Sequence, residues 1–219
     1  SYTDPEYHQF DIILPDVDDY GTGMVFLPVD ESQSNYCQEI FKKIILEENQ
    51  KFLGWRNVPT NDDLLGPTAK EGEPTFKQIF IGKNENIDSS AFDRKLYIIR
   101  KRVENHIWNS DISEQNLFYV PSLSYRTFVY KGMLTGTQIE PMFPDLSEPD
   151  VESALALVHQ RFSTNTMPEW KLAHPFRYIS HNGEINTVRG NSNWMRARES
   201  LCKSELFGEE LNKLFAIIP

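Results

Sequence analysis

The sequence predicts a layered α+β fold, in which helices cover a sheet. Helical spacing of apolar residues recurs near residues 35–50 and 194–215, and short β-prone runs lie between these regions. The chain has 219 residues, of which 39% are hydrophobic and 12% aromatic, so it is long enough to bury a sizeable core in one large or two small domains.

The first elements are a strand and a helix. Residues 23–27 form a short apolar run that ends at Pro28, which favours a buried strand. A helix follows over about 35–50, with Ser34 as its expected N-cap. Five residues share one face of that helix: Cys37, Ile40, Phe41, Ile44 and Ile45. Cys37 is therefore expected to be a small core residue and not a catalytic thiol.

The next region is less clear. Residues 52–58 are a second strand candidate. Residues 75–81 form an apolar unit whose period cannot be assigned. Residues 92–103 combine apolar positions at helical spacing with a β-prone run, so helix and strand both stay open.

The second half of the chain is richer in strand patterns. Residues 117–120 and 127–130 resemble a strand pair. Residues 154–158 are apolar on both faces, which is typical of a central strand buried between layers. A further short strand is predicted over 177–180, and helical spacing follows over 194–215.

Charge and composition exclude several classes of protein. The net charge of −10 leaves no basic surplus for nucleic acid, and no apolar run approaches the ~20 residues of a membrane span. The polar, acidic start of the sequence is neither a signal nor a transit peptide. Two cysteines make no disulfide framework, so a reducing, cytosol-like compartment is expected.

Polar residues with chemical potential gather after the predicted strand 154–158. Arg161 offers a planar, permanently charged fork that suits a small carboxylate. Thr164 and Asn165 lie just beyond it and can hydrogen-bond a polar ligand. By itself, an arginine at such a place is more often part of a structural ion pair, so both interpretations stand.

A second group lies near the predicted strand 177–180. The side-chain amide of Asn182 and the backbone N–H of Gly183 could together stabilise an oxyanion. The dipeptide is also a common tight turn, which is the structural alternative. Three of the five histidines, 159, 174 and 181, fall in this region, but their spacing matches no zinc motif and no metal is predicted.

Taken together, these strings resemble the class II, N-terminal-nucleophile glutamine amidotransferases, and within them the large chain of glutamate synthase. The resemblance covers the chain from about residue 20 onward, while residues 1–20 match poorly. The matching stretches are 25–28, 54–59, 96–102, 130–134, 159–166, 172–177, 181–191 and 194–195, together with Pro168 and Trp170. The stretch 184–191 resembles glutamate synthase and disfavours other class II enzymes, such as asparagine or glucosamine-phosphate synthase.

The resemblance implies a fold and a set of residue roles. The fold would be a four-layer α/β/β/α sandwich with two mostly antiparallel sheets, and residues 1–219 would form part of one such domain. Arg161 would hold the α-carboxylate of L-glutamine, with Thr164 and Asn165 lining the same pocket. Asn182 and Gly183 would form the oxyanion hole, and His174 would orient the substrate loop.

The resemblance also implies a reaction that this sequence carries only in part. In the family, an N-terminal cysteine thiolate attacks the amide of glutamine, and the ammonia released aminates 2-oxoglutarate. Cys37 and Cys202 stand in the wrong context for that nucleophile, and the aspartate that binds the substrate amino group is absent. The isolated chain is therefore expected to be inactive. A non-catalytic module that binds an amino acid or a partner chain remains the alternative.

Further cofactors and partners follow from the same resemblance. FMN and an iron–sulfur cluster are expected in other domains of the full-length enzyme, because these residues supply neither clustered cysteines nor a glycine-rich phosphate loop. The electron donor, whether NADPH, NADH or ferredoxin, cannot be derived from this region. A cytoplasmic location is expected, with an organellar stroma as the other option.

Overall fold

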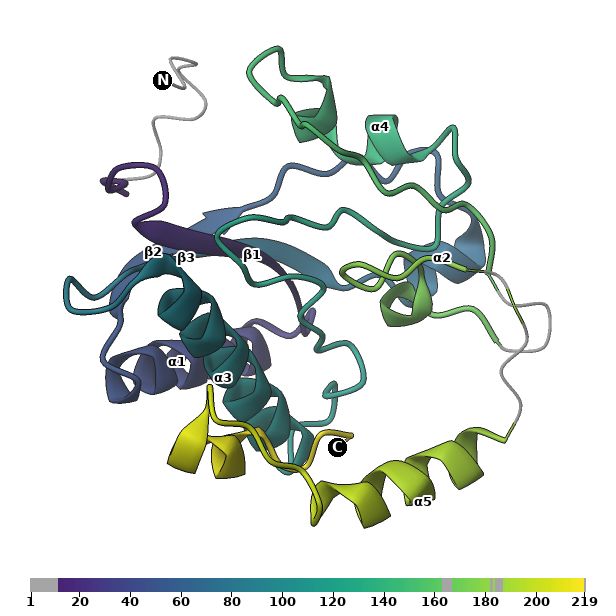
Figure 1. Cartoon of the computed structure of the whole chain (residues 1–219). Coiled ribbons are helices and arrows are strands. Elements are labelled where there is room, and N and C mark those ends of the chain that lie inside the picture. The colour runs from purple at the N-terminus through teal and green to yellow at the C-terminus, as the bar shows by residue number, and fades with distance from the viewer. Residues whose placement is uncertain (1–11, 163–166, 182, 184–186, 219) are drawn as a thin grey trace.

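The computed structural model describes residues 12–162, 167–181, 183 and 187–218. Its centre is a three-stranded antiparallel sheet in the order β1-β3-β2 (Figure 1). The strands are β1 (Tyr20–Leu27), β2 (Lys51–Asn57) and β3 (Thr75–Gly82). The predicted strands over 23–27 and 52–58 are confirmed, and the unassigned unit 75–81 is the central strand.

Two long helices cover one face of the sheet, α1 (Glu31–Glu47) and α3 (Ser89–Trp108) (Figure 1). The expected N-cap at Ser34 is wrong. Asp30 is the cap, because its carboxylate accepts the backbone N–H of Gln33 at 2.9 Å, and Ser34 lies buried inside the helix. The predicted apolar face of α1 is confirmed, and the ambiguous region 92–103 is helical.

The sheet is apolar on both faces, and each face has its own core. In β1, Val25 and Leu27 belong to the cluster beneath α1 and α3, whereas Met24 and Phe26 belong to the cluster on the other face. Successive side chains of a strand point to opposite faces, so one continuous apolar run serves both layers. This explains why the strand pattern in 23–27 showed no alternation.

Irregular chain and short helices cover the second face. They include α2 (Pro67–Glu71), α4 (Ile139–Met142) and the 3-10 turns η2 (Pro144–Ser147) and η3 (Trp170–Leu172). Trp170 anchors η3, since its buried indole N–H donates to the carbonyl of Ala69 at 2.9 Å. The indole also occupies the space above Gly132, where a Cβ would lie 2.3 Å from the ring.

The predicted strand pair 117–120 and 127–130 is wrong. The two segments do not pair with each other: Tyr119 of the first segment and Ser124, in the loop between them, form isolated bridges with Phe26 and Thr22 of β1, and 127–130 is irregular. An edge strand presents unpaired N–H and C=O groups. The chain after α3 uses them, so the pairing partner is β1 and not the neighbouring segment.

The predicted central strand 154–158 is also wrong. The segment is irregular, and the side chains of Leu155 and Val158 are 84% and 81% exposed. A central strand needs hydrogen-bonded neighbours on both edges, and no other described residue pairs with this run. Residues 177–180 form a turn, closed by a bridge between Phe176 and Ile179, and not the strand predicted there.

The helical spacing predicted over 194–215 is confirmed in part. It is divided between α5 (Val188–Glu199), which begins earlier than expected, and the 3-10 helix η4 (Gly208–Leu214). η4 packs against α3, while α5 extends away from the sheet and buries none of its own residues (Figure 1). Among the described helices, none combines the length and the apolar character needed to cross a membrane.

Candidate functional site

The predicted site residues differ in how far the structure describes them. Thr164, Asn165 and Asn182 lie outside the described residues. Arg161 is described and exposed, and no hydrogen bond or ion pair joins it to another described residue. His174 and Gly183 are also described, and both belong to a group of contacting polar residues.

The centre of this group is a histidine cluster, which consists of His159, His174 and His181. The ring of His174 lies 5.0 Å from that of His159 and 5.0 Å from that of His181, measured between centroids. The Nδ1 of His174 and the Nε2 of His159 are buried and have no hydrogen-bond partner among the described residues. The sequence placed these histidines in one region, and folding brings their rings together.

The pKa of His174 is lowered from its ordinary value. Burial is the main cause, because a charged imidazolium loses its hydration there, and the charges of His159, His181 and Lys131 act in the same direction. A hydrogen bond with the backbone of Ile179 opposes the shift. The neutral imidazole is therefore favoured at the centre of the cluster.

The backbone N–H of Gly183 has a partner of its own. It donates to the Nδ1 of His181 at 3.2 Å, and Gly183 itself is exposed. A donor for an oxyanion must point at the reacting atom, so in this arrangement the N–H would have to leave His181 when it binds a ligand.

Sequence reasoning missed one residue of this region, Lys131. Its side chain is only 1% exposed, and its Nζ donates to the backbone carbonyl of Lys171 at 2.8 Å. The Nζ also lies 4.4 Å from the ring centroid of Tyr119 and 4.3 Å from that of Phe176. Burial, followed by the charge of Arg100, lowers the pKa of Lys131 to about 7. The signal in the sequence was a lysine inside the otherwise apolar run 128–134.

Arg177 fixes the other end of the same segment. Its Nη2 lies 3.2 Å from the Oδ2 of Asp93, near the start of α3. The segment that carries His174 is thus held by Lys131 and Trp170 on one side and by Asp93 on the other.

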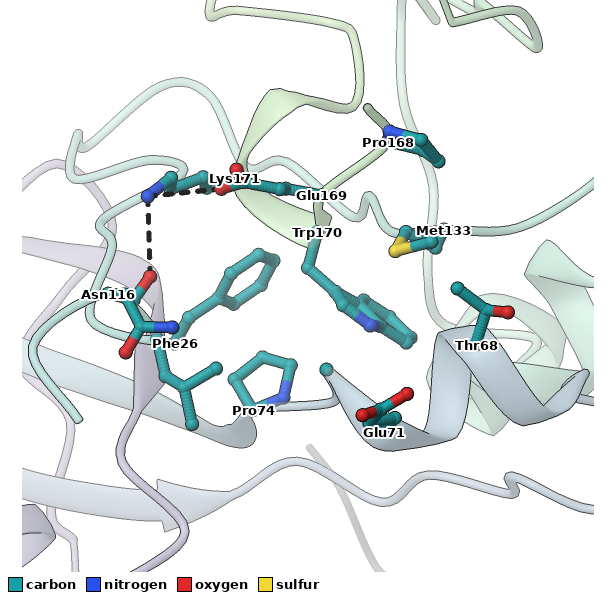
Figure 2. A pocket seen from close by; sticks show the side chains of 12 residues that line it. Phe26, Thr68, Glu71, Pro74, Asn116, Met133, Pro168, Glu169, Trp170 and Lys171 are labelled. Carbon is teal, nitrogen blue, oxygen red and sulfur yellow. Dashed lines mark hydrogen bonds and ion pairs between the residues drawn. The ribbon is translucent and has the colours of Figure 1, made fainter. Parts of the chain in front are cut away.

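A separate cavity of about 290 Å³ lies beside η3 (Figure 2). Trp170 and Phe26 form its apolar walls, and Glu71 lies at its rim. Lys171 reaches across to Glu169 at 3.1 Å and to the carbonyl of Asn116 at 3.5 Å. None of the predicted site residues that the structure describes, Arg161, His174 and Gly183, lines this cavity.

Comparison with known proteins decides the family. The model of the class-II glutamine amidotransferases matches residues 2–219, which is nearly the whole chain. The chain belongs to the class-II glutamine amidotransferases. The antiparallel sheet with helices on one face agrees with the N-terminal-nucleophile hydrolase fold that this family implies.

Curated relatives of this amidotransferase chain are glutamate synthases. It is 48% identical over 208 residues to the NADPH glutamate synthase large chain of Bacillus subtilis, which covers 94% of this chain and 13% of the relative. It is 42% identical over 217 residues to the NADH glutamate synthase of Saccharomyces cerevisiae, with 95% and 10% covered. The ferredoxin-dependent glutamate synthase of Pyropia yezoensis is 39% identical over 197 residues, with 90% and 13% covered. The chain thus spans about a tenth of the relatives' length.

The amidotransferase chain itself offers no thiol placed for catalysis. Cys37 is fully buried in α1, and burial raises the pKa of its thiol to about 12. Cys202 follows α5, and its Sγ donates to the carbonyl of Arg198 at 3.5 Å. Two cysteines on separate elements do not fit an iron–sulfur cluster, which needs about four thiolates. The described residues also include no group of three or more histidines, cysteines or carboxylates able to hold a metal.

Proposed function

We propose that this chain is part of the glutamine-hydrolysing domain of a glutamate synthase. The observation that carries the proposal is the match to glutamate synthases along 90–95% of the chain, although the three relatives named above use different electron donors. These enzymes differ in their electron donor, and the region that they share with this chain is the amidotransferase region. The alternative is an amidotransferase fold that binds an amino acid without hydrolysing it.

The site proposed for L-glutamine is built around Arg161. Its guanidinium is exposed and has no described partner, which leaves its fork available for the substrate α-carboxylate. Thr164 and Asn165 follow it in the sequence and would line the same pocket. His174, held at the centre of the histidine cluster, would orient the loop beside the substrate.

The oxyanion hole is proposed at Asn182 and Gly183. A tetrahedral intermediate at the glutamine amide carries a negative oxygen, which two N–H donors would stabilise. The exposed Gly183 amide is one such donor once it exchanges His181 for the substrate. The nucleophile is a cysteine with a free α-amino group, and neither Cys37 nor Cys202, both internal, has one.

The complete reaction needs more than these residues. Attack of the thiolate on the amide releases ammonia and leaves a glutamyl thioester, which water hydrolyses to glutamate. The ammonia would aminate 2-oxoglutarate in another domain, where FMN and an iron–sulfur cluster belong; the electron donor is NADPH, NADH or ferredoxin. Residues 1–219 would be part of a four-layer α/β/β/α domain, with 1–20 as a leader, in the cytoplasm or an organellar stroma.

Release of glutamate from L-glutamine by the protein that carries this chain tests the proposal. Arg161→Ala should raise the KM for glutamine by about 100-fold, because a charge-assisted bidentate contact is lost. Arg196→Ala, at an exposed arginine of α5, is the matched control and should leave KM unchanged. Glutamine that binds without being hydrolysed would favour the non-catalytic alternative. An unchanged KM in Arg161→Ala would exclude the proposed substrate site.

A further inference from the structure

Lys131 is a buried amine whose presence needs an explanation. Its side chain is 1% exposed, and no carboxylate pairs with its Nζ among the described residues. A buried cation without an ion partner loses hydration that the protein only partly replaces. A hydrophobic side chain of similar length would fill the same space without that cost, so packing alone does not account for a lysine here.

The contacts of Lys131 point toward the histidine cluster. Its Nζ lies 4.3 Å from the ring centroid of Phe176, and that ring lies 4.6 Å from the ring of His174 in an edge-to-face arrangement. The ring of His174 in turn lies 5.0 Å from the ring of His181, measured between centroids. His181 accepts the N–H of Gly183 at 3.2 Å. A continuous series of contacts therefore runs from the lysine to Gly183.

The lysine also holds the backbone of the same segment. Its Nζ donates to the carbonyl of Lys171, the residue next to the buried anchor Trp170. The adjacent Gly132 lets the Trp170 indole pack directly on the backbone next to the lysine, since a Cβ there would lie 2.3 Å from the ring. The Lys131 amine thus holds the backbone at Lys171, which precedes His174, and the ring of Phe176, which follows it.

We propose that Lys131 is a positioning residue that holds Phe176 and His174, and through them His181 and Gly183, for the proposed hydrolysis of glutamine. The role of Lys131 in hydrolysis rests on the proposed function, whereas its contacts with these residues do not depend on that function. Among the described residues, no hydrogen bond, ion pair or ring contact joins Lys131 to Arg161 or His174, so it acts through the rings that it holds.

Charges around Lys131 make its effect measurable. The positive charge of Arg100 in α3 lowers the pKa of Lys131. The Lys131 amine also lies over the ring of Tyr119, and Phe176 separates it from His174. The positive charge of Lys131 lowers the pKa of His174. Removing that charge should therefore raise the pKa of His174 slightly, since burial, the main cause of the low pKa, stays in place, whereas an arginine at position 131 should keep the pKa low.

The first test is NMR titration of the histidine rings in the 219-residue chain. Lys131→Met should raise the pKa of His174 and shift the ring resonances of His174 and His181, while Lys131→Arg should keep the low pKa. Lys203→Met, at an exposed lysine, is the matched control and should change neither. Histidine resonances that are the same in Lys131→Met and in the original chain would overturn the proposal.

A second test uses glutamine hydrolysis by the protein that carries the chain. Lys131→Met should lower kcat by about tenfold with KM nearly unchanged, because misplaced groups slow chemistry more than they weaken binding. Absence of hydrolysis in the original protein would defeat the proposed function and leave the NMR result to decide the positioning role. Full kcat in Lys131→Met would defeat the positioning role alone.

Should Lys131→Met fail to fold, the original chain still provides a test. The ¹³Cε resonance of Lys131 should titrate near pH 7, and the ring resonances of Phe176, which carries no titratable group, should change with the same midpoint. A Phe176 ring that stays unchanged while the lysine loses its proton would overturn the proposal.

Discussion

The Nζ of Lys213 lies 2.9 Å from each carboxylate oxygen of Glu48. The Glu48 side chain is fully buried at the end of α1, and it also contacts Lys95 at 2.9 Å and Arg102 at 2.6 Å. These three cations come from α3 and η4, so one carboxylate joins the C-terminal part of the chain to the two long helices. This contact and the buried Leu214 together place η4.

We predict that Glu48→Gln destabilises the chain by about 1–3 kcal/mol, because it removes the buried charge that three cations share, although Lys95 and Lys213 keep Glu210 and Arg102 keeps Glu47. Urea unfolding followed by circular dichroism measures the change. Glu39→Gln, at an exposed position of the same helix, is the control and should alter stability little. Equal stability of the two variants would show that the buried cluster contributes nothing.

Acid should weaken the same cluster. Burial alone would raise the pKa of Glu48, but the hydrogen bonds from Lys213, Lys95 and Arg102 together lower it below the ordinary value of 4.5. The folded state thus binds a proton less readily than the unfolded state. The stabilisation is complete above pH 4.5 and is lost as the pH falls through the lower folded pKa. Unfolding free energies measured below pH 4.5 should fall more steeply in the original chain than in Glu48→Gln.

Gly132→Ala should destabilise the second face of the sheet. The new Cβ would lie 2.3 Å from the Trp170 ring, which is buried and cannot move away freely. We expect a loss of about 1–3 kcal/mol and a shifted tryptophan emission. Gly72→Ala is a matched control, because its Cβ would meet the same indole at an ordinary 3.8 Å. A Gly132→Ala chain as stable as this control would contradict the close approach.

Cys37 should resist thiol reagents in the folded chain. It is fully buried and the pKa of its thiol is raised to about 12, so almost no thiolate forms at neutral pH. A disulfide-exchange reagent should modify only Cys202 before unfolding and both thiols after it. Cys202→Ser should then show no reactive thiol until denaturant is added. Rapid reaction of that variant in its folded state would contradict the buried position of Cys37.

Local patterns were sufficient where local interactions decide the structure. The spacing of Cys37, Phe41 and Ile44 predicted the buried face of α1, since that face depends only on the helical period. The N-cap was misplaced because Ser34 and Asp30 are both capable caps, and only the contact with Gln33 selects between them. The pattern of 92–103 fits both a helix and a strand, and packing against the sheet selects the helix α3.

The proposed site residues divide in the same way. The sequence placed Arg161, His174 and Gly183 in one short region, and the class-II amidotransferase family follows from the order of residues alone. Only the fold shows which group accepts the Gly183 N–H, because the Nδ1 of the His181 ring lies 3.2 Å from it.

The sequence by itself thus determined the family, the strands β1 and β2 and the buried face of α1. Tertiary structure alone decided that 154–158 is exposed, that Tyr119 pairs with β1, and that Lys131 lies against Phe176, which contacts the histidine cluster. The physical reason is the range of the interactions. Helical and strand periods are set by neighbours a few residues apart, whereas burial and pairing depend on which distant segments meet.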